Sequence, residues 1–372
     1  MDLLEYTDID LQKLSNEQLL KLYTEAHDKA FEYHINQLTK KILINSLYGA
    51  TANAFFPLYN LGYASGITCN GRYFIQKTAN YIEEKLQELL PWNQKYVIYG
   101  DTDSVYYTIE PFVNKYKNSH PDADLNELVD FCNDFSDKVI QPVIDKSIDD
   151  MSKDFNVFDK SRIKAKKEVV CDVMVNCAKK KYYARVRDSE GTRYDVNNPH
   201  IKVMGLELAK STTPQWVKDN IRNAIPIMFD GDEDSLKQWI EKTKCGYTKS
   251  PIDDIAQVGK ANNLNYRLSD KGVPMLSRCA IVYNKFVKDN NLSSYYSPIE
   301  PAEKFKYVRL LEPNIFNSDC IAYKNSRFVN TYLKDIIDYD TMFEKSFIEP
   351  LSLMCECMGY NFKRKTAPVD EW

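Results

Sequence analysis

The chain has 372 residues, of which 44% are hydrophobic and 27% are charged, as in an ordinary folded protein. Its formal net charge of −4 excludes a chain that is basic overall, so any attraction to polyanions must come from local basic patches. No apolar run approaches the roughly 20 residues that span a bilayer, and no signal-peptide pattern opens the chain. Nine irregularly spaced cysteines and only four histidines argue against a zinc site or a disulfide framework, and favour the reducing cytoplasm.

The first predicted element is one long helix, from about Asn16–Tyr48. Ser15 and Gln18 have the spacing of a capping box, good helix formers follow, and Gly49 is expected to end the helix. At about 1.5 Å per residue this helix is roughly 50 Å long, and such helices usually pack against another. Residues 1–14 read as a short acidic loop, so we expect the antiparallel partner of the helix to be missing.

Three polar side chains of this helix share one face. Lys41, Asn45 and Tyr48 have the spacing i, i+4 and i+7. A cation, an amide and an aromatic ring could there contact a phosphate, a polar base edge and the plane of a base. The spacing alone favours a simpler alternative, in which Lys41 is solvated and Tyr48 is buried.

A predicted hairpin carries two acidic residues at its tip. Tyr99-Gly-Asp-Thr-Asp-Ser104 lies between Lys95–Tyr99 and Val105–Ile109, which are rich in β-branched and aromatic residues and are predicted to be strands. Asp101 and Asp103 would repel each other unless a divalent cation neutralised them, and oxygen ligands suit Mg²⁺. Alternatively, these residues only build the turn. Two acids between apolar strands favour the metal site.

The rest of the chain mixes helices and strands. Helices are predicted at residues 64–90 and 125–151, and strands at 163–175, 181–187 and 201–208. Beyond Ser211-Thr-Thr-Pro214 helices and polar loops predominate, which places a domain boundary there. A helix, a mixed region and a mainly helical region together predict an α+β fold.

The densest basic run is Lys179, Lys180 and Lys181, followed by Tyr182 and Tyr183 in a strand-like segment. A run of charges is usually only a solvated face. In an acidic chain, this local reversal of sign predicts a patch that contacts phosphates. A weaker candidate is a polar loop region further on, with Lys260, Asn262, Asn263, Lys271 and Arg278.

Several of these segments form an ordered set. They are Lys41-Ile-Leu-Ile-Asn-Ser-Leu-Tyr-Gly49, Tyr99-Gly-Asp-Thr-Asp-Ser104, Lys179-Lys-Lys-Tyr-Tyr183, and Ile201-Lys-Val-Met-Gly-Leu-Glu207 followed by Ser211-Thr-Thr-Pro214. In this order they resemble the motifs of family B DNA polymerases. The resemblance extends to the T-even-type bacteriophage polymerases through Gly66-Ile-Thr-Cys-Asn-Gly-Arg72 and Lys345-Ser-Phe-Ile-Glu-Pro350.

The resemblance implies the C-terminal part of such an enzyme. Residues 1–52 would form the second half of the fingers, residues 53–212 the palm, and residues 213–372 the thumb and tail. The upstream Asp-x-x-Ser-Leu-Tyr-Pro motif, the first fingers helix and a 3′→5′ exonuclease domain have no counterpart in the sequence. We therefore expect one half of a split replicative polymerase, completed by an N-terminal companion polypeptide with the exonuclease domain and upstream aspartate. A recombinant fragment is the alternative.

The resemblance also implies the reaction. The primer 3′-hydroxyl would attack the α-phosphorus of a deoxynucleoside triphosphate (dNTP) and expel pyrophosphate, at a site with two Mg²⁺ ions. Asp101 and Asp103 would be the catalytic, metal-binding carboxylates, and Asp103 would bridge the metals together with the missing aspartate. Lys41 would hold the triphosphate, while Asn45 and Tyr48 would flank the nascent base pair.

The resemblance also implies roles for Glu168, for the C-terminal tail and for the basic run, and the first two have alternative interpretations. Glu168 matches another palm acid near the metals, or is an ordinary surface residue of a strand. The tail Thr366–Trp372 would be a degenerate sliding-clamp peptide or a frayed terminus. Primer–template DNA would be held by Lys179, Lys180, Lys181, Tyr182 and Tyr183.

Two other functions compete with polymerisation. The incomplete set of carboxylates suggests a non-catalytic remnant that only binds duplex DNA, although the retained Asp101 and Asp103 speak against it. The Asp-Thr-Asp sequence also resembles the Mn²⁺ motif of nucleotide-sugar glycosyltransferases. That fold needs a βαβ nucleotide-binding half, for which the sequence has no candidate.

Overall fold

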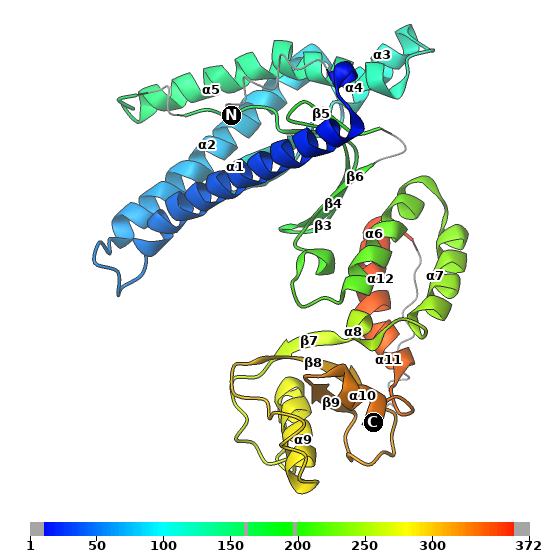
Figure 1. The fold of residues 1–372 in the computed structure, drawn as a ribbon. Helices are drawn as coiled ribbons and strands as arrows, with labels where there is room; N and C mark the ends of the chain where they lie inside the picture. Colours follow the sequence, from blue (N-terminus) through cyan, green and yellow to red (C-terminus); the bar gives the residue numbers. More distant parts are fainter. Residues whose placement is uncertain (1–10, 160–162, 196–198, 361–372) are drawn as a thin grey trace, which may run out of the picture. The chain divides into compact units, whose positions relative to one another are not determined.

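The computed structural model describes residues 11–159, 163–195 and 199–360. These residues form helices and three small antiparallel sheets, which confirms the predicted α+β class (Figure 1). The chain divides into two units, residues 1–121 with 135–166 and residues 122–134 with 167–372. The division into fingers, palm and thumb at residues 52 and 212 remains a prediction.

The first unit consists of helices around one hairpin. Its elements are α1 (Asn16–Ala50), α2 (Leu61–Leu89), β1 (Val97–Asp101), β2 (Ser104–Tyr107), α3 (Glu110–Ser119), a π-helical turn (Ser136–Ile140) and α5 (Gln141–Asp154), with a 3₁₀ turn (Leu11–Lys13) before them. α2 packs along α5 (Figure 1). The core between these elements is formed by Ile82, Leu86, Tyr96, Ile140, Ile144 and Ile148.

Helix α1 begins as the capping box predicts. The Ser15 N–H donates to Gln18 Oε1 at 2.9 Å, and the Gln18 N–H donates to Ser15 Oγ at 3.3 Å. The helix continues one residue past Gly49, because the Thr51 hydroxyl caps it by donating to the carbonyl of Tyr48 at 2.5 Å. α1 has no buried residue. Its exposed large apolar side chains are Leu20, Tyr23, Phe31, Tyr33, Ile35, Leu38, Ile42, Leu43, Ile44, Leu47 and Tyr48.

The second unit contains two sheets. Its helices are α4 (Leu125–Phe135), α6 (Gln215–Asp230), α7 (Glu233–Tyr247), α8 (Ile252–Ile255), α9 (Met275–Asp289), α10 (Ser326–Tyr332), α11 (Tyr339–Phe343) and α12 (Glu349–Cys357), with a 3₁₀ turn (Glu207–Ala209) and a π-helical turn (Glu344–Ile348). The strands of the first sheet are β3 (Val169–Ala178), β4 (Lys181–Ser189), β5 (Thr192–Arg193) and β6 (His200–Met204). β4 is central, since it pairs with the other three.

The second sheet is an element that the sequence analysis did not predict. The region beyond Pro214 is mainly helical, as predicted, but β7 (Gln257–Lys260), β8 (Lys304–Arg309) and β9 (Cys320–Tyr323) also form a three-stranded antiparallel sheet there. These strands are short, and β7 pairs with β8 across more than forty residues of intervening chain. Local patterns predict such strands poorly, because tertiary packing decides them.

Two predicted strands have different boundaries. Residues 163–168 are irregular, and β3 begins at Val169. Ile163 and Ala165 pack against the core of the first unit, so their apolar character comes from burial and not from a strand. The strand predicted at 201–208 ends at Met204. The helical predictions for residues 16–48, 64–90 and 125–151 are confirmed, whereas α3 was not predicted.

Of the helices in the described part of the chain, none has both the length and the apolar composition of a membrane span.

Leu86→Ala should destabilise the first unit by about 2–5 kcal/mol, because Leu86 is fully buried in its core. Hydrogen exchange followed by mass spectrometry should then accelerate in α2, α5 and β1, but not in β7–β9, whose core is separate. Leu20→Ala, at a side chain that is 67% exposed on α1, is the control and should change exchange little. Equal acceleration in both units would contradict the separation of the two cores.

Candidate active site

The structure places the two acids at the tip of the predicted hairpin. β1 and β2 pair antiparallel, and Asp101 opposite Ser104 is their last pair. The backbone N–H of Asp103 donates to the carbonyl of Asp101 at 2.5 Å, and Ser104 Oγ donates to the same carbonyl at 3.2 Å. Thr102 has φ 45°, in the left-handed region that a β-branched residue rarely adopts. The turn is therefore tight and locally strained.

Helix α2 supports the hairpin. The backbone N–H of Val97 in β1 donates to the Glu83 carboxylate of α2 at 2.8 Å. Across the two strands, the rings of Tyr99 and Tyr106 lie 5.5 Å apart. Cross-strand aromatic pairs of this kind stabilise a hairpin. The acidic tip is thus mounted on a long helix and does not depend on two strands alone.

The donor set of the hairpin suits a hard cation. Asp101 is half-buried and Asp103 is exposed, and both offer carboxylate oxygens. Mg²⁺ is commonly held by one or two carboxylates together with substrate phosphates and water. Within the described ranges, no group of three or more His, Cys, Asp or Glu side chains is arranged to hold a metal ion. Asp101 and Asp103 thus offer oxygen donors of the kind that Mg²⁺ prefers, but two carboxylates alone do not make such a group.

Helix α1 presents the predicted polar face. Lys41, Asn45 and Tyr48 lie within one unbroken helix of the unit that contains the hairpin, and all three are exposed. The Tyr48 side chain is 43% exposed, so the alternative with a buried Tyr48 is wrong. The three side chains are open to a ligand.

The predicted basic run occupies a turn in the second unit. Lys179 and Lys180 form the turn between β3 and β4, and Lys181 is the first residue of β4. All three are exposed. Lys180 has φ 62°, which is uncommon for a residue other than glycine. We call these three residues the lysine turn.

Comparison with known proteins decides the family. The model of DNA polymerase family B matches residues 14–120, and that of divergent family B DNA polymerases matches residues 91–235. The DNA-directed DNA polymerase of Enterobacteria phage T4 is 30% identical, over 98% of this chain and 42% of its own length. The chain belongs to DNA polymerase family B. This membership decides against the glycosyltransferase alternative.

Other relatives agree. The DNA-directed DNA polymerase of Escherichia phage RB69 is 29% identical, over 97% of this chain and 41% of its own length. The DNA polymerase catalytic subunit of human herpesvirus 6A is 27% identical, over 53% of this chain and 17% of its own length. The chain thus spans less than half the length of the phage polymerases it resembles.

The tyrosines beside the lysine turn differ from the lysines in their surroundings. Tyr182 is 5% exposed and Tyr183 is fully buried. The Tyr183 hydroxyl donates to the carbonyl of Met354 at 3.0 Å, its ring stacks on Phe229 with centroids 5.5 Å apart, and burial raises the pKa of the phenol. In this family B chain the lysines face solvent, while the two tyrosines pack inside the second unit.

Glu168 lies immediately before β3, in the second unit, whereas Asp101 and Asp103 belong to the first. Its side chain is 63% exposed, and Oε1 is 3.2 Å from Lys202 Nζ of β6. Within its own unit Glu168 is therefore half of an exposed ion pair. The ion pair does not test whether Glu168 binds a metal, and that role stays a prediction.

A polar cavity that the sequence did not predict adjoins the lysine turn. Its volume is about 410 Å³, and residues far apart in the sequence line it. They include Lys181, Gly205, Glu207, Thr212, Thr213, Lys345, Ser346 and Glu349. Residues of three segments that resemble polymerase motifs in the sequence, Ile201–Glu207, Ser211–Pro214 and Lys345–Pro350, thus line one cavity.

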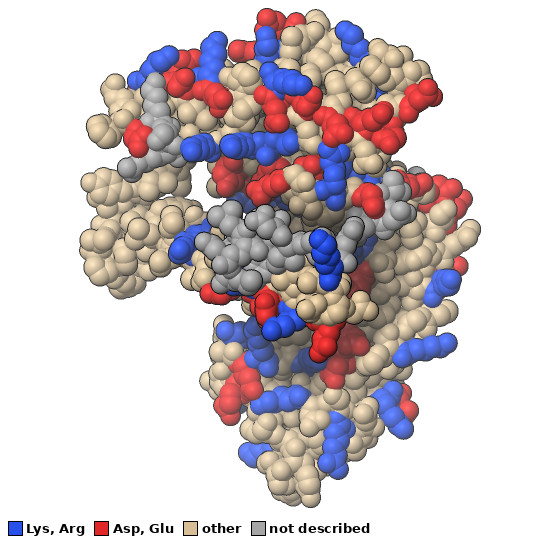
Figure 2. All heavy atoms as spheres, turned by 45° about the horizontal axis from the view of Figure 1, so that its top comes forward, with Lys and Arg blue, Asp and Glu red and all other residues tan. Residues whose placement is uncertain are grey.

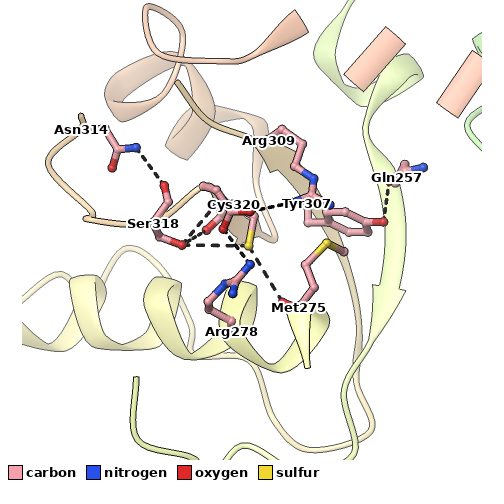
Figure 3. A network of polar contacts seen from close by, with 9 residues as sticks. Gln257, Met275, Arg278, Tyr307, Arg309, Asn314, Ser318 and Cys320 are labelled. Carbon is pink, nitrogen blue, oxygen red and sulfur yellow. Dashed lines mark hydrogen bonds and ion pairs between the residues drawn. The ribbon is translucent and has the colours of Figure 1, made fainter. Parts of the chain in front are cut away.

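Arg278, in the candidate polar region from Lys260 to Arg278, has a structural role. Arg278 lies in α9, not in a loop, and its guanidinium is 2.8 Å from the Asp319 carboxylate. Arg309 of β8 is also 2.8 Å from this carboxylate. Figure 3 shows both arginines beside Cys320 at the start of β9, where Ser318 Oγ donates to the Cys320 carbonyl at 2.8 Å. This network joins α9 to the second sheet.

Basic and acidic side chains are intermixed over the face drawn in Figure 2. This distribution agrees with the small net charge of −4. Attraction of a polyanion must therefore depend on local groups such as the lysine turn.

Tyr183→Phe should lower the free energy of unfolding by about 1 kcal/mol, because it removes the buried hydrogen bond to the Met354 carbonyl. Denaturant unfolding followed by circular dichroism measures this loss. Lys181→Ala, at an exposed position of the same strand, is the comparison and should change the free energy of unfolding by less than about 0.5 kcal/mol. Equal losses of stability in the two variants would contradict a structural role of the Tyr183 hydroxyl.

Proposed function

We propose that this chain is the C-terminal catalytic part of a DNA-directed DNA polymerase that adds deoxynucleotides to a primer 3′-hydroxyl. The observation that carries the proposal is the hairpin with Asp101 and Asp103 at its tip, in a chain that belongs to family B. The exposed face of Lys41, Asn45 and Tyr48 lies in the same unit. A nucleotidyl transfer site needs carboxylates to hold the metal ions, a cation to bind the triphosphate, and side chains to contact the incoming base, and these five residues offer such groups.

Each residue has a proposed task. Asp101 and Asp103 would hold two Mg²⁺ ions together with a further aspartate, and the metal when bound would supply charge stabilisation at the reacting phosphate. The Lys41 ammonium would bind the triphosphate and offset charge that develops on the leaving pyrophosphate. Asn45 and Tyr48 would contact the nascent base pair, where the Tyr48 ring can report its shape.

Duplex DNA would be held by the second unit. Lys179, Lys180 and Lys181 are exposed residues, and their ammonium groups suit contacts to backbone phosphates, which position a duplex without reading its sequence. Tyr182 and Tyr183 would act by supporting the strand that carries these lysines, since both are buried. Glu168 would be a further acid near the metals only if it gave up its ion pair with Lys202.

We further propose an N-terminal companion polypeptide that brings the upstream aspartate motif and an exonuclease domain. One observation supports it: α1 leaves its large apolar side chains exposed. A helical segment of the companion would cover that apolar surface except for Tyr48, whose ring would stay open to the base pair. The complex would work in the cytoplasm of the host cell.

Contact with a sliding clamp through Thr366–Trp372 is also proposed. That segment lies outside the described residues.

One observation favours a second candidate function. Among the described residues, no group of three or more His, Cys, Asp or Glu side chains is arranged to hold a metal ion, and a protein that only binds duplex DNA needs no such group. Primer extension separates this candidate from the polymerase.

Asp103→Asn should abolish primer extension by the chain mixed with its companion in Mg²⁺ and all four dNTPs. The loss should be at least about 10²-fold, because a metal ligand supports several kcal/mol of transition-state stabilisation. Asp122→Asn, at an exposed acid outside the site, is the matched control and should keep full activity. The chain without the companion should extend no primer.

Two results would overturn the proposal. Full activity of Asp103→Asn in the mixture would favour the duplex-binding function. Robust extension by the chain alone would show that the site needs no further aspartate from a companion.

Leu43→Asp should weaken association with the companion by at least about tenfold, because it places a charge on the apolar surface of α1 where the side chain is 70% exposed. The fold should not suffer, since this residue packs against no core. Asn36→Asp, which adds the same charge at an exposed polar position of α1, is the control. Analytical ultracentrifugation measures association, and equal binding by both variants would exclude α1 from the interface.

A further inference from the structure

Gly205 makes an unusually close backbone contact with the lysine turn. It follows the last residue of β6 and has φ +65°. A Cβ atom at this position would lie 1.9 Å from the carbonyl oxygen of Lys180 and 3.0 Å from its carbonyl carbon. No side chain can approach a backbone carbonyl so closely, so only glycine allows the two segments to meet here.

The backbone of Lys180, which faces Gly205 in this contact, is also conformationally restricted. Lys180 itself has φ 62°, and the turn it occupies joins β3 to β4. β4 pairs with β6 up to Tyr182 opposite Met204, which places Gly205 next to the end of the ladder. The lysine turn is therefore held between its own hairpin and the backbone of Gly205.

The contact also reaches the side chain of Lys181. Its Cγ would be 3.3 Å from a Cβ at Gly205, and both residues line the polar cavity of about 410 Å³. A displacement at Gly205 would thus move the backbone of Lys180 and the stem of Lys181 together. The positions of neighbouring ammonium groups decide how many phosphates of a duplex they can contact at once.

We propose that Gly205 is a positioning residue for primer–template binding: its missing side chain lets β6 hold the lysine turn in the shape that meets the DNA backbone. The proposal rests on the proposed function of the lysine turn. Gly205 touches no reacting atom and acts through Lys180 and Lys181.

A second glycine of the same sheet provides a control, because it has a positive φ but makes no close contact with another segment. Gly191, in the turn between β4 and β5, has φ +88°, and a Cβ there would meet no atom within 4 Å. Gly191→Ala therefore carries the backbone strain of a positive φ without a collision. Gly205→Ala carries the strain and also displaces the lysine turn.

The experiment measures primer–template affinity of the full chain by fluorescence anisotropy over a range of salt concentrations. Each phosphate contact adds about 0.9 to the slope of log affinity against log salt concentration on B-DNA. Gly205→Ala should lower the affinity about tenfold and reduce the slope by about 1–2, as expected for one or two lost contacts. Gly191→Ala should keep the wild-type slope.

A kinetic measurement distinguishes positioning from a general loss of structure. In the mixture with the companion, Gly205→Ala should raise the KM for primer–template while kcat stays within about twofold, because only duplex binding is affected. Wild-type affinity and slope in folded Gly205→Ala would overturn the proposal. So would an equal loss in Gly191→Ala.

Lys181→Ala distinguishes failure of this inference from failure of the proposed function. If Lys181→Ala leaves affinity and slope unchanged, the lysine turn does not bind DNA, and both proposals fall. If Lys181→Ala reduces the slope but Gly205→Ala does not, only the positioning role of Gly205 falls.

A matched pair at Lys180 tests the geometry if Gly205→Ala does not fold. Lys180→Asn and Lys180→Val both remove the ammonium group, but asparagine tolerates φ 62° and β-branched valine does not. Lys180→Val should lose more of the salt slope than Lys180→Asn, because it also disturbs the turn. Equal slopes for the two variants would overturn the proposal.

Discussion

Two carboxylates side by side repel each other, and a two-stranded hairpin in water is too unstable to hold them together alone. The first unit meets this constraint by anchoring the hairpin to α2, where Glu83 accepts the backbone N–H of Val97. α2 is held in turn along α5, with Thr78 Oγ1 2.9 Å from Ser147 Oγ and the Tyr81 hydroxyl 3.0 Å from the Asp150 carboxylate. The acidic tip is therefore the end of a supported framework.

In the second unit the charge that needs a partner is a buried cation. Arg187 is 5% exposed, and a buried cation is tolerated only when it is paired. Its guanidinium lies 2.9 Å from the Asp172 carboxylate of β3, which also accepts from Arg185 Nε at 3.0 Å. Arg185 bonds to Asp230 at the end of α6 as well. These ion pairs join β3, β4 and α6.

Local signals predicted the elements that carry the chemistry. The capping box at Ser15, the helix through Tyr48 and the hairpin around Asp101 all depend on residues close in sequence, and the structure confirms them. The burial of Tyr183 could not be predicted in this way, because its partner Met354 is 171 residues away. The same holds for the ion pair of Arg278 with Asp319, which is 41 residues away. In the sequence, Tyr183 and Arg278 are candidates for DNA contacts, whereas the fold shows that both make contacts within the protein.

The sequence by itself determined the family, the acidic hairpin and the order of the polymerase motifs, because each is a short pattern whose chemistry depends on adjacent residues. Only the tertiary structure decided which members of those motifs face solvent. It exposed Lys181 and buried Tyr183 in one strand, and it brought the backbone of Gly205 against Lys180. The reason is physical: burial and close approach arise between segments distant in sequence, and no local pattern records which segments will meet.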